Sequence, residues 1–218
     1  MRAAPVLKRT CMRDHIRDVL VERILDGTYP AGTQLKELTL AREFNVSQAP
    51  IREALRELEG SGLVTSERYR GTRVRGADLA ELRESYELRT LMEERALQLA
   101  APYPPDLLAD LTACVSAMAQ AVARDDRERY IDEALSFHRR LIQAGGNRTF
   151  LAVWDSLHWD VRGRVALRRI ASHGVGLPPL VELHRGLLAR LRSGDVAGAT
   201  QQLKTIFGRI ASSFERPA

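Results

Sequence analysis

The sequence predicts a mainly α-helical protein with two domains: an N-terminal winged helix-turn-helix (three helices plus a β-hairpin), then an all-α helical bundle. Apolar residues recur at helical spacing through most of the 218 residues. The early part of the chain also contains one convincing hairpin pattern, whereas no stretch after residue 78 alternates as a strand does. We expect a flexible basic arm (1–10), the winged domain (11–75) and the bundle (79–218).

Five elements are predicted in the winged domain. Helices are expected over residues 12–26, 36–44 and 48–60, where apolar residues are spaced by three and four. Two short strands, 63–66 and 72–74, are expected on either side of a turn that contains glycine. The order helix, helix, tight turn, helix, hairpin is that of a winged helix-turn-helix.

The third helix begins with an unusual cap. Ser47 is a favourable N-cap residue, and Pro50 then falls in the first turn, where a missing amide proton is tolerated. Because Pro50 has no N–H to offer the serine, the Ser47 hydroxyl has two alternatives. It can accept from the Ala49 amide, or it can reach outward to a phosphate.

The outer face of this helix carries polar side chains at four-residue spacing. Gln48, Arg52 and Arg56 share that face, and Ile51 and Leu55 lie on the opposite, apolar side. Glutamine can pair with adenine and arginine with guanine in the major groove. An ordinary amphipathic surface helix would show the same pattern, but the preceding turn and the following hairpin favour a recognition helix.

The hairpin tip is strongly basic. Arg68, Arg70, Arg73 and Arg75 surround Gly71, which allows close approach of the backbone to another molecule. The tip can therefore meet phosphates or enter a minor groove, and the alternative is a basic turn without a partner.

Charge and composition narrow the class of protein. Residues 1–76 hold 14 Lys/Arg against 10 Asp/Glu, and residues 77–218 hold 19 against 18, so the positive excess lies in the first third. No apolar run approaches about 18 residues, and no secretory leader pattern is present, which predicts a cytoplasmic protein without membrane contact. Cys11 and Cys114 are far apart and predict free thiols.

The second domain is predicted to contain six helices that pack as three pairs, with room between them for a ligand. Their approximate ranges are 79–100, 105–123, 127–144, 148–171, 178–193 and 196–213.

Motifs in both domains resemble one bacterial family. The stretches GTYPAGTQLKELTLA (27–41), VSQAPIREALRELEGSGLV (46–64) and GTRV (71–74) closely resemble the winged-helix domain of GntR-family transcription regulators. The second domain resembles the all-helical ligand-binding domain of the FadR-type branch, through ELRTLMEE, FHRRLIQAGGN and ELH. A count of six helices is similar to the VanR-like subgroup.

The resemblance implies a homodimer that binds an inverted-repeat operator in double-stranded DNA. It also implies a small effector, usually a carboxylate, in the helical domain. By analogy, Ser47, Gln48, Ala49, Arg52 and Gly71 would lie at the DNA. Relatives often have Arg-Thr-Pro where this chain has Gln-Ala-Pro, so we expect a different operator preference, with Gln48 as a reader of one base.

Many relatives hold a divalent metal through one Asp and three His. His138 and His184 occupy two of these places, but Ala134 stands at the Asp position and Ile206 at the last His position. Two imidazoles without a carboxylate make a poor metal site, so we expect no required cofactor. Zinc or nickel at His138 and His184 remains the alternative, with His158 as a substitute ligand.

The same histidines are candidates for effector binding. We expect His138 and His184 to line a polar pocket, where they hydrogen-bond an effector, a water or each other. Arg89 either meets the negative end of the ligand or pairs with Glu93 one turn away. His158 and its neighbour Trp159 are placed on the fourth helix of this domain and are expected to pack.

Three functions are compatible with these features. The first is a ligand-responsive transcriptional regulator, a repressor by family analogy, that an organic acid releases from DNA. The second is a DNA-binding regulator whose helical domain only dimerises and binds no metal or effector. The third, a metal-assisted enzyme, lacks a nucleophile–base pair, and the missing Asp leaves no general base beside the histidines.

Overall fold

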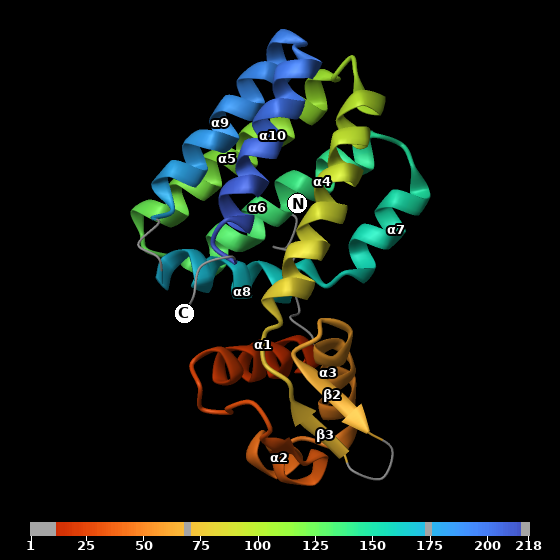
Figure 1. The fold of residues 1–218 in the computed structure, drawn as a ribbon, viewed down its shortest axis with the longest axis vertical. Helices are drawn as coiled ribbons and strands as arrows, with labels where there is room; N and C mark the ends of the chain where they lie inside the picture. Colours follow the sequence, from red (N-terminus) through yellow and green to blue (C-terminus); the bar gives the residue numbers. More distant parts are fainter. Residues whose placement is uncertain (1–11, 68–70, 173–175, 215–218) are drawn as a thin grey trace, which may run out of the picture. The chain divides into compact units, whose positions relative to one another are not determined.

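The computed structural model describes residues 12–67, 71–172 and 176–214 (Figure 1). The predicted basic arm, Cys11, Arg68 and Arg70 lie outside these ranges. The chain divides into two compact units, Met1–Asp78 and Leu79–Ala218. The predicted fold class, a winged helix-turn-helix followed by an all-helical domain, is confirmed.

The first unit contains three helices and three strands among its described residues. In chain order they are α1 (Met12–Leu25), β1 (Gln34–Leu35), α2 (Glu37–Glu43), α3 (Gln48–Gly60), β2 (Val64–Glu67) and β3 (Gly71–Val74). Helices α1 and α2 both pack against α3. The core between them includes Ile16, Leu20, Ile51 and Leu58, which are completely buried. This packing fixes α3 by its apolar face and leaves its polar face at the surface.

The wing has one more strand than the sequence predicts. The sheet order is β1-β3-β2, and both pairings are antiparallel, with Leu35 opposite Thr72 and Val64 opposite Val74. Strand β1 is only two residues long, and it is a strand only because it pairs with β3, about forty residues further along the chain. A pattern read along the sequence does not contain that contact.

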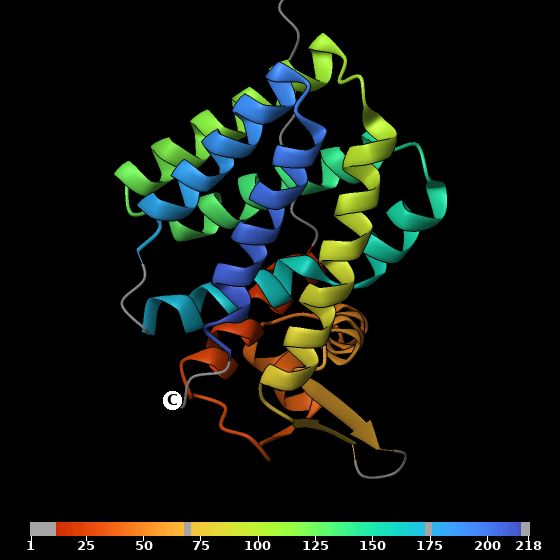
Figure 2. The same cartoon turned by 45° about the horizontal axis from the view of Figure 1, so that its top comes forward.

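The second unit is made of helices in all its described residues. They are α4 (Leu79–Ala100), α5 (Pro105–Ala123), α6 (Arg127–Ala144), α7 (Arg148–Ser156), α8 (Trp159–Ser172), α9 (Pro178–Ser193) and α10 (Val196–Ala211). Helix α6 packs against α4, α5, α7 and α8, and α10 packs against α4, α8 and α9. In Figures 1 and 2, α8 runs across one end of the other helices.

The prediction of one helix over 148–171, and therefore of six helices, is wrong: the described residues 79–214 contain seven. The chain turns at His158, whose φ of 49° interrupts the helical backbone. Trp154 and Trp159 explain the break. Five residues apart on a continuous helix they would point about 140° away from each other, whereas here both are buried and their ring centroids lie 6.2 Å apart. His158 and Trp159 therefore do not share a helix as predicted.

Side-chain caps set several helix starts in this domain. Asp126 accepts from the Arg129 amide at the start of α6, and Asp195 accepts from the Gly198 amide at the start of α10. Asn147 accepts from the amides of Thr149 and Phe150 at the start of α7, as the sequence predicts. Each cap satisfies amides that the first turn leaves without a helical partner.

Helix α5 is long and apolar enough, by length and composition only, to cross a membrane. The core helix of a soluble bundle passes the same test. Here α5 packs against α6 and α9 and buries residues such as Leu111, Cys114 and Met118. Cys114 is a free thiol, in agreement with the sequence.

Candidate functional site

The N-terminus of α3 is exposed and beside a shallow groove. Ser47, Gln48 and Ala49 are all exposed, and the groove between α2 and α3 is lined by residues that include Arg42 and Asn45. Ser47 occupies the N-cap position with an extended backbone, but its side chain makes no capping hydrogen bond. The first of the two predicted alternatives, a hydrogen bond from the Ala49 amide to the Ser47 hydroxyl, is therefore not formed.

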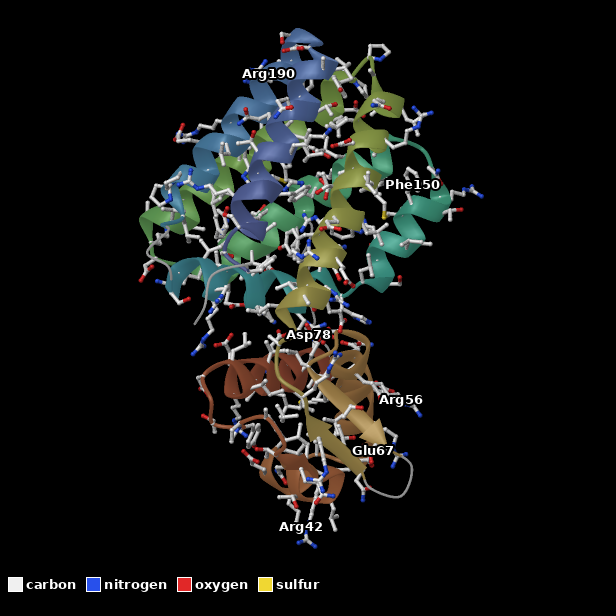
Figure 3. All side chains as sticks on the ribbon, viewed as in Figure 1. Arg42, Arg56, Glu67, Asp78, Phe150 and Arg190 are labelled. Atoms are coloured by element: carbon white, nitrogen blue, oxygen red, sulfur yellow. The ribbon has the colours of Figure 1, made fainter. Side chains whose placement is uncertain are left out.

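Two arginines follow on the same face of α3. Arg52 is half-exposed, and its guanidinium lies 2.8 Å from Glu37 of α2. This hydrogen bond lowers the pKa of Glu37, so the pair is ionised. Arg56 is exposed, and its side chain points away from the domain, as does that of Arg42 (Figure 3). Arg52 therefore faces outward as predicted, but an acidic neighbour orients it.

The described part of the wing presents Gly71 and Arg73. Gly71 has a φ of +78°, which residues with a side chain rarely adopt, and a Cβ there would lie 3.3 Å from Nε2 of Gln34. Arg73 is exposed, and its Nη1 donates to the carbonyl oxygen of Gly32 over 3.2 Å. Arg70, the remaining predicted contact, lies outside the described residues.

The helical domain contains a small pocket with a volume of about 50 Å³. Side chains from α4, α6, α8, α9 and α10 line it, and most of them are apolar. The polar side chains in its wall are those of Tyr86, Arg89, Tyr130, His138 and His184. Arg89 and both histidines are at least 97% buried, which makes this the most polar region of the domain's described interior.

A continuous series of hydrogen bonds connects these residues. Arg89 Nε donates to Glu93 Oε1 over 2.7 Å, and the other oxygen of Glu93 lies 2.6 Å from Nδ1 of His138. The Nε2 atoms of His138 and His184 are 3.1 Å apart. Nδ1 of His184 lies 2.7 Å from the carbonyl oxygen of Leu180. The series joins α4, α6 and α9 through the centre of the domain.

Burial and neighbouring charges set the protonation of this cluster. Burial alone would raise the pKa of Glu93, but His138 and Arg89 outweigh it and lower that pKa to about 2. Burial lowers the pKa of His138, although Glu93 opposes the effect. Burial and the proximity of His138 lower the pKa of His184 to about 3. At neutral pH Glu93 is therefore ionised and His184 is neutral.

Aromatic rings surround the guanidinium of Arg89. Its central carbon lies 4.7 Å from the ring centroids of both Trp159 and Phe207, and Tyr86 and Trp154 are also within 6 Å. Such contacts stabilise a buried cation through the ring faces. Trp159 is buried, so the predicted packing role of this residue agrees with the structure.

The structure corrects one prediction about this cluster and resolves another. Arg89 pairs with Glu93, one of the two alternatives for this residue. The expectation that no carboxylate lies beside the histidines is wrong, because Glu93 contacts His138. Sequence spacing suggested the Arg89–Glu93 pair, but His138 lies 45 residues further on, and no local pattern connects it to Glu93.

The four positions that the family resemblance assigns to a metal do converge. Ala134, His138, His184 and Ile206 all line the same pocket, but only the two histidines carry ligand atoms. Within the described ranges no group of three or more His, Cys, Asp or Glu gathers in a way that could hold an ion. Glu93 contacts Nδ1 of His138, whereas Nε2 of that ring is the nitrogen that faces His184. The side chains present therefore do not fit a divalent metal.

Two family matches cover most of the chain. Residues 12–74 match the bacterial regulatory proteins of the gntR family, and residues 84–209 match the FCD domain. The first match contains the winged helix-turn-helix and the second contains the pocket. Together they define a DNA-binding transcription regulator with a ligand-binding domain, and not an enzyme.

Relatives of known role agree with this class. The chain is 32% identical over 189 residues to a probable D-xylose utilization operon repressor of Paenarthrobacter nicotinovorans, covering 87% of this chain and 82% of the relative. It is 29% identical over 197 residues to the gluconate operon repressor of Bacillus subtilis, covering 88% and 81%. A GntR regulator structure from Rhodococcus sp. RHA1 has the same fold, with a TM-score of 0.71, 22% identity and coverage of 93% and 96%. The chain belongs to the GntR family of bacterial transcription regulators, with an FCD domain as its second domain.

Proposed function

We propose that this protein is a ligand-responsive repressor that binds an inverted-repeat operator as a homodimer in the cytoplasm. The observation that carries the proposal is a buried polar cluster beside a pocket, in a domain of the type that binds effectors. The effector would enter this pocket and change the affinity of the winged domain for its operator. Transcriptional repressors among the relatives support the direction of control.

In this proposal α3 enters the major groove. Gln48 and Arg52 read base edges, Ser47, Ala49 and Arg56 lie near the backbone, and the wing contributes the remaining contacts. The support is geometric: the apolar face of α3 is buried in the core, and its polar face is exposed. The Glu37–Arg52 pair restricts the guanidinium before DNA arrives, which lowers the entropy lost on binding.

Arg52→Ala tests this function. We expect operator affinity to fall by about 1–3 kcal/mol, because a bidentate base contact is lost. A gel-shift titration on an operator selected from random DNA measures it. Arg185→Ala removes an exposed arginine from α9 of the other domain, and it serves as the matched control. Equal affinities for native protein and Arg52→Ala would remove Arg52 from the interface.

The proposed homodimer has a candidate surface on α4. Leu88, Leu91 and Leu99 form an exposed stripe along this helix, and Leu91 is 66% exposed. If two copies of α4 pack antiparallel about Leu91, Glu87 faces Arg95 of the partner subunit, because both lie four residues from the centre. The centre of the stripe is thus complementary to itself in charge.

Leu91→Arg is expected to convert the dimer to a 24.4 kDa monomer, because it places two like charges at the symmetry axis. Light scattering measures the mass. Ala189→Arg adds the same single positive charge on the exposed surface of α9 and is expected to leave the dimer intact. A dimer that persists in Leu91→Arg would place the interface elsewhere.

The expected effector is a small organic acid, and no metal cofactor is required in this proposal. Arg89 in the pocket wall supports an acid, although Glu93 already balances its charge. The second candidate, a helical domain that only dimerises, is favoured by the small volume of the pocket, about 50 Å³. A ligand that changes operator affinity in a saturable way would favour the effector-binding function over a domain that only dimerises.

A further inference from the structure

Leu38 is an exposed apolar residue in the DNA-binding unit. It lies in the first turn of α2 and is 51% exposed, whereas Leu40 and Ala41 of the same short helix are buried in the core. Among the described residues of this unit, Met12 is the other large apolar side chain with this exposure. A single exposed apolar residue is common on a protein surface, so the surroundings of Leu38 decide whether it has a partner.

Leu38 forms part of the groove at the N-terminus of α3. The apolar residues in the wall of this groove are Leu38, Ala41 and Val46, and Arg42 is the only charged one among the described residues that line it. A partly apolar wall with one positive charge suits an occupant that combines negative charge with apolar groups. DNA is such an occupant, because its phosphates are negative and its major-groove edge carries methyl groups.

One ion pair and one shared groove place Leu38 beside the polar face of α3. Glu37 directly precedes Leu38, and its carboxylate lies 2.8 Å from the guanidinium of Arg52 on α3. Gln48, the first residue of α3, lines the same groove as Leu38. In a helix-turn-helix, the second helix enters the major groove while the helix before it crosses the DNA backbone. An α3 that reads DNA therefore brings Leu38 to the edge of the same major groove.

The chemistry of leucine limits what it can recognise there. Its side chain has no hydrogen-bond donor or acceptor, so it cannot read the polar groups of a base. The methyl group on the major-groove edge of DNA belongs to C5 of thymine. Gln48 can pair with adenine, whose partner base is thymine, so a base pair that suits Gln48 also presents a methyl group.

We propose that Leu38 is a specificity-determining residue that contacts a thymine methyl group of the operator, beside the adenine that Gln48 reads. The inference rests on the proposed function, because it requires α3 in the major groove. It extends the reading of bases from α3 to α2. Gln48 and Leu38 would then select A·T pairs by two different means, hydrogen bonds and apolar contact.

Replacement of thymidine by deoxyuridine tests this contact, because deoxyuridine keeps the hydrogen-bonding groups and lacks only the methyl group. An operator is first selected from random DNA with the full-length native protein. Each thymidine of one half-site is then replaced in turn. We expect one replacement at which native affinity falls about fourfold, the value of one buried CH₂ group. If no thymidine of the half-site responds, the inference is overturned.

Leu38 variants show whether that methyl group is read by α2. Leu38→Ala is expected to bind the thymidine operator more weakly by a similar factor and to lose most of its response to deoxyuridine, because the two changes remove the same contact. Leu38→Met keeps an apolar side chain of similar volume and should retain the response. Met12→Ala removes an equally exposed apolar side chain that does not line the groove, and it is the matched control.

Two further results would contradict the inference. In the first, Leu38→Ala responds to deoxyuridine as strongly as the native protein. In the second, Leu38→Ala weakens binding to the thymidine and deoxyuridine operators equally, as a contact with the sugar would. Thermal unfolding of each variant establishes that it folds. Failure of the proposed function is distinguishable, because the native protein would then select no operator, or Arg52→Ala would bind it with native affinity.

Discussion

Glu93→Ala is expected to lower the free energy of unfolding of the helical domain by about 3–5 kcal/mol. Glu93 is completely buried and is the common partner of Arg89 and His138. Its removal leaves the Arg89 guanidinium buried without its counter-charge and takes away the acceptor that holds Nδ1 of His138. Urea denaturation followed by circular dichroism measures the change.

Glu182→Ala is the matched control for this prediction. Glu182 also pairs with an arginine on its own helix, Arg185 of α9, but both partners are exposed. An exposed pair of this kind contributes at most about 0.5 kcal/mol. If Glu93→Ala destabilised the domain no more than Glu182→Ala, the buried cluster would contribute little to stability.

Ala134→Asp combined with Ile206→His is expected to create a zinc site. Both positions line the pocket beside His138 and His184, so the double variant would present one carboxylate and three imidazoles to a common centre. We expect one zinc ion per chain after dialysis, measured by metal analysis, and none with the native protein. Zinc should also raise the thermal stability of the double variant.

Ala134→Asn with Ile206→His controls for the change in side-chain size, because the amide is a poor zinc ligand of the same shape as Asp. A folded double variant that retains no zinc would show that the four positions do not share a centre. Ile206 is completely buried, so thermal unfolding without metal establishes first that each variant folds.

Local signals predicted much of this fold. Helix α3 spans the residues that its apolar spacing predicts, with Ser47 at the N-cap position but without a side-chain cap bond, and Asn147 caps α7 through amides two and three residues away. In both cases the residues that decide the structure are neighbours in sequence. Such interactions can be recognised without knowledge of the rest of the chain.

The features that were missed depend on distant residues. Strand β1 exists through its pairing with β3, and Glu93 meets His138 from another helix. The break at His158 has no glycine or proline to mark it. It is explained by the burial of Trp154 and Trp159 together, which becomes visible only in three dimensions.

The two tryptophans on either side of that break make the helical domain accessible to fluorescence. The chain contains two tryptophans, and both lie in the helical domain beside Arg89, whose side chain lines the pocket. Their indole N–H groups are buried and have no hydrogen-bond partner among the described residues. Tryptophan emission of the unlabelled protein therefore originates in the helical domain alone. A change in its intensity or wavelength would report an event in that domain without interference from indoles in the DNA-binding domain.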